Sequence, residues 1–209
     1  EPLKNKRFRG LIYVFALSGL SNAIPGLLIL FFIDDVLQTP NIGWLFILIY
    51  FVSSGFAIPV WVKFAKRVGK IRAWYIGMGL SILSFCGAFS LGVSDIYFYA
   101  VICLMSGLAN GADLTVPFSI LADTIKSKNK NSEVVSNASY FGIWQFIEKS
   151  NLGLAAGCCL PILGYFGYQP GQAESNTDLL KAMYSIFPCC LKFTAMIMLR
   201  KVETAKVNL

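Results

Sequence analysis

The sequence contains no histidine, and only 14% of its 209 residues are charged. Without histidine the chain cannot form an imidazole-based catalytic triad, and it lacks the commonest nitrogen ligand of zinc. A soluble domain has about 25% charged residues and about 45–50% apolar residues. Here the hydrophobic residues reach 56%, so we expect lipid to be the solvent of this chain.

Metal-site spacing is also missing from the cysteines. All six fall inside apolar runs, and none shows the C-x-x-C spacing of a metal site. We interpret these thiols as small packing residues. The net charge of +7 does not indicate nucleic-acid binding, because the basic residues are divided among the connections between apolar runs and do not form one patch. We therefore expect no cofactor, no bound metal beyond a coupling cation, and no nucleic-acid partner.

Six long apolar segments predict six transmembrane helices. A helix needs about 20 mainly apolar residues to cross the hydrocarbon layer. Only helices and closed barrels pair every backbone polar group within lipid, and the runs here are continuous, which excludes the alternating pattern of a barrel. The predicted fold is therefore an all-α membrane protein with one six-helix bundle. The spans are expected at 11–33, 42–62, 73–93, 96–122, 140–166 and 179–199.

Lysine and arginine positions predict the orientation of these helices. Fifteen of the 18 basic residues fall on one side of the predicted spans, and the opposite side has only Lys181. The remaining two, Lys149 and Lys192, lie within spans. Cytoplasmic loops carry the excess of Lys and Arg in membrane proteins. Both termini are therefore expected to be cytoplasmic, and the acidic loop at Asp34 and Asp35 external.

The fifth predicted span carries polar residues at mid-depth. Gln145, Glu148 and Lys149 lie within one sector of a helix. A charge near the bilayer centre costs about 2.5–3.5 kcal/mol on insertion scales, so such a group usually faces a cavity or a partner. We expect Lys149 to face a cavity. The alternatives are a Glu148–Lys149 couple that neutralises itself, although adjacent residues pair poorly on a helix, and a lysine that snorkels to the interface.

The fourth predicted span places Asn110, Asp113 and Pro117 on one face. Proline removes a backbone donor and clashes with the carbonyl four residues earlier, so a kink is expected beside a buried acid. Such a helix suits a moving, solvent-lined position. The alternative is that Asp113 lies nearer an interface and only satisfies the broken hydrogen-bond ladder. The first span repeats the pattern with Ser18, Asn22, Pro25 and Gly26 on one side.

Two further features of the spans are interpreted as structural. Lys192 lies eight residues before Arg200, a distance of about 12 Å along a helix, so it reaches the interface only partly, and we expect a structural role for it. The glycine-rich stretches 77–79 and 153–157 are expected to allow close helix packing.

Three motifs occur in an order that resembles the second half of the glycoside–pentoside–hexuronide:cation symporters, the melibiose-permease-like family of the major facilitator superfamily. They are the basic connection from Pro59 to Arg72, the stretch from Gly111 to Asp123, and the segment from Tyr140 to Lys149. The resemblance covers nearly the whole chain. It implies helices seven to twelve of a twelve-helix transporter, in a multi-pass protein of the cell membrane, with a bacterial inner membrane as the expected location.

The resemblance also implies roles for individual residues. In the family a lysine on helix eleven helps couple cation and sugar, and Lys149 matches that position. The connection before the third span resembles the cytoplasmic gating loop of the family, although a positive-inside anchor also explains most of its charges. The predicted cavity residues are Lys149, Gln145, Glu148, Trp144, Asp113, Asn110 and Asn22, and the predicted gating-loop residues are Lys66, Arg67, Gly69, Lys70 and Arg72.

The predicted function is cation-coupled symport, with Na⁺ or H⁺, of a sugar or related small solute. The principal cation carboxylates of the family lie on its first half, which this chain lacks. Transporters with parallel repeats bind their solute between the halves, so a solitary half is not expected to transport. It is expected to pair with an N-terminal six-helix half or with a second copy, or to be a truncated, non-transporting remnant.

A membrane enzyme is the least favoured class. Asp113, Asp123 and Glu148 are possible acids or bases, but no nucleophile–base pair or metal-ligand spacing accompanies them in the sequence. We therefore predict that the chain is not an enzyme.

Overall fold

The computed structural model describes residues 6–128, 134–172 and 177–207, and every regular element in those ranges is helical. The predicted all-α membrane fold is therefore confirmed. Lys4 and Lys130, which contributed to the predicted orientation, lie outside the described residues. The long helices are α1 (Lys6–Phe31), α2 (Gly43–Val68), α3 (Lys70–Ala88), α4 (Ile96–Lys128), α5 (Val134–Tyr165) and α7 (Phe187–Val207).

Short helical turns complete the chain between these helices. A π-helical turn at Phe32–Val36 continues α1, and a 3-10 turn at Pro40–Ile42 leads into α2. The short helix α6 (Thr177–Lys181) runs through a second π-helical turn, Ala182–Ile186, into α7. The sixth predicted span, 179–199, therefore falls on three consecutive helical segments.

Five helical stretches in the described residues are long and apolar enough to cross a membrane. They are Phe8–Val36, Pro40–Val68, Lys70–Ala88, Ile96–Lys126 and Thr177–Val202. Each matches one predicted span, with ends that differ by several residues. Helix α5 has 32 residues but is not among the five. The polar run Glu148-Lys-Ser-Asn151 at its middle lowers the hydropathy of this helix.

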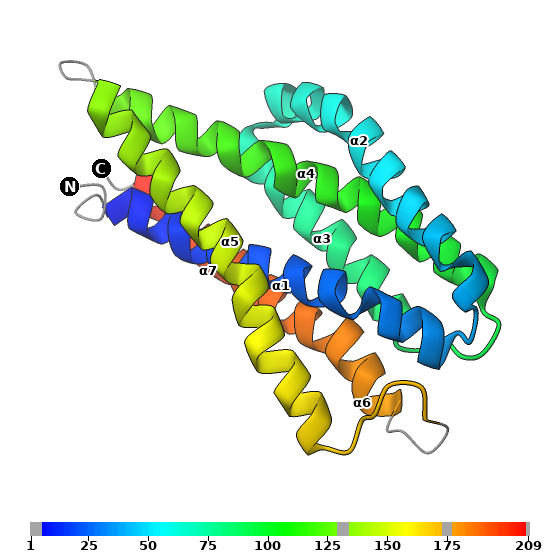
Figure 1. Ribbon diagram of the computed structural model, residues 1–209. Helices are drawn as coiled ribbons and strands as arrows, with labels where there is room; N and C mark the ends of the chain where they lie inside the picture. The colour runs from blue at the N-terminus through cyan, green and yellow to red at the C-terminus, as the bar shows by residue number, and fades with distance from the viewer. Residues whose placement is uncertain (1–5, 129–133, 173–176, 208–209) are drawn as a thin grey trace.

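The helices form one bundle in which α4 is central to one side and α1 to the other. Helix α4 packs along α2 and α3, while α1 packs against α7, α5 and α4 (Figure 1). The start of α1 and the end of α7 lie at the same end of the bundle, together with the end of α4 and the start of α5. The π-helical turn after α1 lies at the opposite end. This arrangement is the one expected for an even number of crossings.

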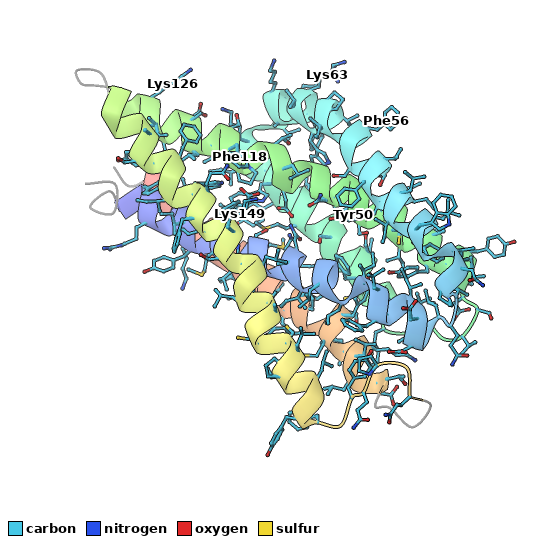
Figure 2. All side chains as sticks on the ribbon, viewed as in Figure 1. Tyr50, Phe56, Lys63, Phe118, Lys126 and Lys149 are labelled. Carbon is cyan, nitrogen blue, oxygen red and sulfur yellow. The ribbon has the colours of Figure 1, made fainter. Side chains whose placement is uncertain are left out.

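The outer face of α2 is apolar and exposed. Phe51, Phe56 and Val60 have 63–75% of their surface accessible, and Figure 2 shows Phe56 pointing away from the bundle. Large exposed apolar faces mark membrane or protein contacts. We interpret this face as the one that meets lipid or another membrane segment.

Close contacts at glycine hold α4 against its neighbours. A Cβ atom added at Gly107 would lie 2.4 Å from the backbone oxygen of Tyr50 on α2, and one added at Gly77 would lie 2.5 Å from the Cβ atom of Ala112. The expectation for Gly77 is therefore confirmed, whereas that for Gly79 is wrong, because a Cβ atom added there would meet nothing within 4 Å in the described part of the chain. The expectation for Gly153 and Gly157 is wrong within the described residues, because an added Cβ would meet nothing within 4 Å at either position.

A polar link closes the end of the bundle opposite the chain termini. The Tyr168 hydroxyl donates to one carboxylate oxygen of Asp35, and the backbone N–H of Gly171 donates to the other at 3.0 Å. Burial, followed by the hydrogen bond to Asp35, raises the pKa of Tyr168 above its ordinary value. The link ties the turn after α1 to the connection between α5 and α6.

Candidate functional site

A buried ion pair lies in the interior of the bundle between α4 and α7. The Nζ atom of Lys192 is 2.5 Å from Oδ2 of Asp113, and the two side chains are 1% and 9% exposed. Moving two charges out of water costs several kcal/mol for each ion, and only good geometry with further hydrogen bonds offsets that cost. The surroundings of the pair therefore decide whether it is stable.

Two other helices, α1 and α3, supply those hydrogen bonds. Asn22 on α1 donates to Oδ2 of Asp113 at 2.9 Å and accepts from Lys192 at 2.7 Å. The indole N–H of Trp74 on α3 donates to Oδ1 at 2.8 Å, and the hydroxyl of Ser18 on α1 donates to the same oxygen at 3.2 Å. Both carboxylate oxygens are satisfied, so the pair connects α1, α3, α4 and α7 at one point.

The Asp113 side chain forms part of the wall of a cavity of about 230 Å³ between α1, α4 and α5. Polar and apolar groups share the lining, and it contains two acidic side chains and no basic one. The lining residues are Phe15, Ser18, Gly19, Asn22, Ala23, Asn110, Asp113, Leu114, Pro117, Phe118, Glu148, Asn151 and Leu152. A cavity of mixed lining with a few convergent polar groups is the usual form of a small-molecule site.

A second cavity, of about 40 Å³, continues toward the end of the bundle that carries Asp35. Asn22 and Asn110 line both cavities, and Tyr50, Ser81 and Ser106 line the smaller one among other residues. The side-chain amide of Asn110 donates to the hydroxyl of Ser54 on α2 at 3.0 Å. The two asparagines therefore form a polar partition between the two cavities.

The structure brings four of the seven predicted cavity residues together. Asn22, Asn110, Asp113 and Glu148 all line the larger cavity. This placement favours the first of the two readings of Asp113, because its carboxylate is buried at a cavity wall and bonds side chains of other helices. Asn22 and Asp113 were predicted on separate helices, and their side chains are in direct contact.

The other three predicted cavity residues lie elsewhere on α5. Gln145 and Lys149 are exposed, and Figure 2 shows Lys149 near the middle of that helix. Within the part of the chain that the structure describes, Lys149 forms no ion pair with Glu148. Trp144 is 1% exposed and packs inside the bundle. None of these three side chains lines the cavity itself.

Trp144 joins α5 to the aromatic side chains that close one end of the cavity. Its ring stacks on Phe15 with ring centroids 3.8 Å apart, and its centroid is 5.7 Å from that of Phe118. Both phenylalanines line the cavity. The Trp144 indole N–H is buried and has no hydrogen-bond partner in the described structure. An unpaired buried donor carries a desolvation cost of about 1–3 kcal/mol.

This contact predicts different effects for two replacements of Trp144. Trp144→Ala is expected to lower the free energy of unfolding by about 3–5 kcal/mol, because it opens a cavity in the core. Trp144→Phe removes the unpaired N–H as well as some apolar area, so it is expected to cost less than about 1.5 kcal/mol. Denaturant unfolding of the purified chain in detergent measures both changes. Equal losses for the two variants would show that the indole N–H has a partner.

The predicted gating-loop residues lie at the junction of α2 and α3. Helix α2 ends at Val68, Gly69 is the single residue between the helices with φ +95°, and α3 begins at Lys70. Only glycine adopts this backbone region without strain. The basic segment is therefore two helix ends around one glycine, with Arg67 and Arg72 exposed.

Lys70 connects this junction to α4. Its Nζ atom lies 2.6 Å from the carboxylate of Asp123 and 3.2 Å from the backbone oxygen of Ser119. Lys66 and Lys70 also line a surface pocket of about 150 Å³ with Thr115 and Ser119. A partly exposed ion pair contributes about 0–1 kcal/mol, so this contact is weak enough to open.

Three site residues were not included in the predicted site. Lys192 was expected to be structural, Ser18 was recognised only as a neighbour of Asn22 on its helix, and Trp74 carried no signal. Lys192 and Asp113 are opposite charges at mid-depth in different spans, and that combination was the available indication of a buried pair. Among the described residues, no group of three His, Cys, Asp or Glu side chains is placed to hold a metal ion.

Comparison with known proteins adds a family and two curated relatives. The family model described as MFS/sugar transport protein matches residues 1–203. The sodium-dependent lysophosphatidylcholine symporter 1 of Xenopus tropicalis is 28% identical over 151 residues, which is 69% of this chain and 28% of the relative. The sphingosine-1-phosphate transporter MFSD2B of the same species is 25% identical over 146 residues, 67% of this chain and 26% of that protein. The aligned segment thus spans less than a third of either relative.

Proposed function

We propose a transport function for this chain, which belongs to the MFS/sugar transport protein family: it forms one wall of the path that a small organic solute takes across a membrane. The observation that supports this proposal is the cavity between α1, α4 and α5, with the Asp113–Lys192 pair in its wall. Ionisable groups inside membrane helices are rare and usually mark a solute or ion pathway. Family membership indicates a transporter and not an enzyme.

The chain is proposed to be a C-terminal half, equivalent to helices seven to twelve of a melibiose-permease-like transporter. The three motifs described above, in their order along the chain, support this assignment. The cavity beside Asp113 is walled by the three helices α1, α4 and α5, and the solute of a parallel-repeat transporter lies between two bundles. An N-terminal six-helix half is therefore the proposed partner, and it would cover the cavity from the side of α1, α4 and α5.

Two classes of solute are supported by different observations. A glycoside fits the hydroxyl and amide groups of Ser18, Asn22, Asn110 and Asn151, and it agrees with the resemblance to sugar symporters. A single-chain phospholipid fits the aromatic and leucine side chains on the same wall, and both relatives are named for solutes of that kind. The coupling ion is proposed to be Na⁺ or H⁺, and one relative is named as sodium-dependent.

The proposed orientation places the termini and the α2–α3 junction in the cytoplasm of a cell, with a bacterial inner membrane as the proposed location. The concentration of Lys and Arg in the connections on that side of the predicted spans supports it. Lys66, Arg67, Gly69, Lys70 and Arg72 are proposed to form the cytoplasmic gate, because Lys70 is bonded to α4 through an ion pair that is weak enough to break.

Uptake by reconstituted liposomes tests the proposed function. Liposomes would contain the chain alone, or the chain with an N-terminal six-helix half of the same family, under an inward Na⁺ or H⁺ gradient. The probes would be radiolabelled melibiose and fluorescent lysophosphatidylcholine. We expect gradient-driven uptake of one probe only when both halves are present. Absence of uptake across a broad panel of glycosides and lysophospholipids would instead assign the chain as a non-transporting membrane partner or remnant.

A further inference from the structure

The Lys192 ammonium lies between two oxygen atoms that belong to other helices. It is 2.5 Å from Oδ2 of Asp113 on α4 and 2.7 Å from Oδ1 of Asn22 on α1. Small hard cations take the same ligands, namely carboxylate, amide and hydroxyl oxygen atoms. The ammonium of Lys192 therefore occupies a place that is chemically suited to a metal cation of the same charge.

The carboxylate can be reached from the larger cavity, which Lys192 does not line. Asp113, Asn22 and Ser18 all line the larger cavity, whereas Lys192 extends from α7 behind them and does not contribute to that lining. A cation in the cavity thus meets three oxygen-bearing side chains of the site before it meets the ammonium. Access to the acid does not require Lys192 to enter the cavity.

The charge of the cavity favours a cation as its occupant. Asp113 and Glu148 are the ionisable groups of the lining, and the amides of Asn110 and Asn151 add neutral oxygen atoms. A concave site lined by one sign of charge concentrates ions of the opposite sign. An anion would meet two carboxylates there, so competition for Lys192 by an anionic group is disfavoured.

An exchange of cations also solves the problem of the buried acid. If Lys192 left Asp113 with nothing in its place, an unpaired buried charge would remain, which is strongly destabilising. A monovalent cation at the carboxylate keeps the acid paired with a positive charge. The exchange would also release α7 from α4, since the Lys192–Asp113 pair connects those two helices.

We infer that a small monovalent metal cation binds to the Asp113 carboxylate from the cavity side, beside the oxygen atoms of Asn22 and Ser18, in exchange for the ammonium of Lys192. This inference rests on the proposed transport function for its physiological meaning, and it adds a cation site within this half of the transporter. The pair is then a switch whose two states are lysine-bound and cation-bound carboxylate.

The experiment is an equilibrium measurement on the purified chain in detergent, without solute or a second half. Thermal unfolding is followed at increasing NaCl, with choline chloride keeping the ionic strength constant. A ligand that binds only the folded chain raises the unfolding midpoint in a saturable way. We expect Na⁺ to stabilise the wild-type chain and to stabilise Lys192→Met much more, because that variant keeps the carboxylate and loses the competing ammonium.

The size of the difference follows from the competition. If Lys192 leaves the carboxylate free in about a tenth of the molecules, its removal increases the apparent Na⁺ affinity about tenfold. The double variant Asp113→Asn with Lys192→Met has no buried charge to destabilise it and no carboxylate, and it is expected to lose the Na⁺ response. Asp123→Asn is the matched control, since it removes an aspartate from the other Asp–Lys pair, which is outside the cavity.

Three outcomes would overturn the inference. They are a Lys192→Met chain that is equally unstable in Na⁺ and in choline, a double variant that responds to Na⁺ as the wild type does, and a control variant that loses the response. The unfolding experiment measures Na⁺ binding and not uptake. A negative result there is therefore compatible with solute uptake in liposomes, and Na⁺ binding is compatible with an absence of uptake. The inference and the proposed function are therefore tested separately.

Discussion

Replacing Lys192 with methionine is expected to lower the free energy of unfolding by about 3–5 kcal/mol in the absence of Na⁺. The substitution keeps much of the apolar stem of the side chain but removes the ammonium that lies 2.5 Å from Asp113. Asn22, Trp74 and Ser18 still donate to the carboxylate, but none of them carries a charge. The acid is left as an uncompensated charge in an interior that is shielded from water.

The second substitution Asp113→Asn is expected to restore most of the lost stability in the Lys192→Met background. An amide of the same shape keeps an acceptor for Trp74, and replacement of a whole buried ion pair by neutral groups is often close to neutral. Unfolding of the wild type, both single variants and the double variant in a detergent titration gives the coupling energy. A double variant no more stable than Lys192→Met would mean that the pair does not account for the loss.

Replacing Lys149 with alanine is expected to reduce coupled uptake about 5–150-fold. This factor corresponds to a coupling free energy of about 1–3 kcal/mol between two bound ligands. Lys149 is exposed near the middle of α5 and adjoins Glu148 of the cavity wall. A lysine that faces lipid at that depth would cost about 2.5–3.5 kcal/mol on insertion scales. We therefore expect its exposed side to meet water or the partner half, where the charge acts on the solute or the coupling cation.

Stability separates the two environments of Lys149. If the side chain faces an aqueous path, Lys149→Ala leaves the unfolding free energy nearly unchanged while uptake falls, and Lys149→Arg retains part of the uptake. If it faces acyl chains, the alanine variant becomes more stable by about the insertion cost of a charge and keeps its uptake. Lys126→Ala is the matched control, because Lys126 is an exposed lysine near the end of α4.

The helices could be predicted from the sequence because each depends on a local property. A run of apolar residues long enough to cross the bilayer is visible without knowledge of its neighbours. The same is true of the polar faces, since the 3.6-residue period alone places Asn110 and Asp113 together on one helix. The contact between Asn22 and Asp113 was not predicted, although both helices carry a polar face at mid-depth, where such faces have no lipid partner.

The composition of the site beyond those faces depends on helix rotation, which the sequence does not specify. Lys192 and Asp113 are 79 residues apart, and their contact exists because α7 and α4 both turn these residues inward. Trp144, one helical turn before Glu148, was included among the predicted cavity residues. The cavity ends at Phe15 before it reaches Trp144, because the two rings stack on each other. Gly153 and Gly157 are exposed, because the rotation of α5 turns both away from the other helices.

The packing of α4 also divides that helix into two unequal arms at Pro117. The arm before the proline is held by Gly107 and Gly111 against α2 and by Ala112 against α3, so its polar face cannot turn without separating backbones that already touch. The arm after the proline is connected to the α2–α3 junction by Lys70. A bend at Pro117 would therefore move the arm that carries Asp123, while the carboxylate of Asp113 stays with the arm that is held against α2 and α3.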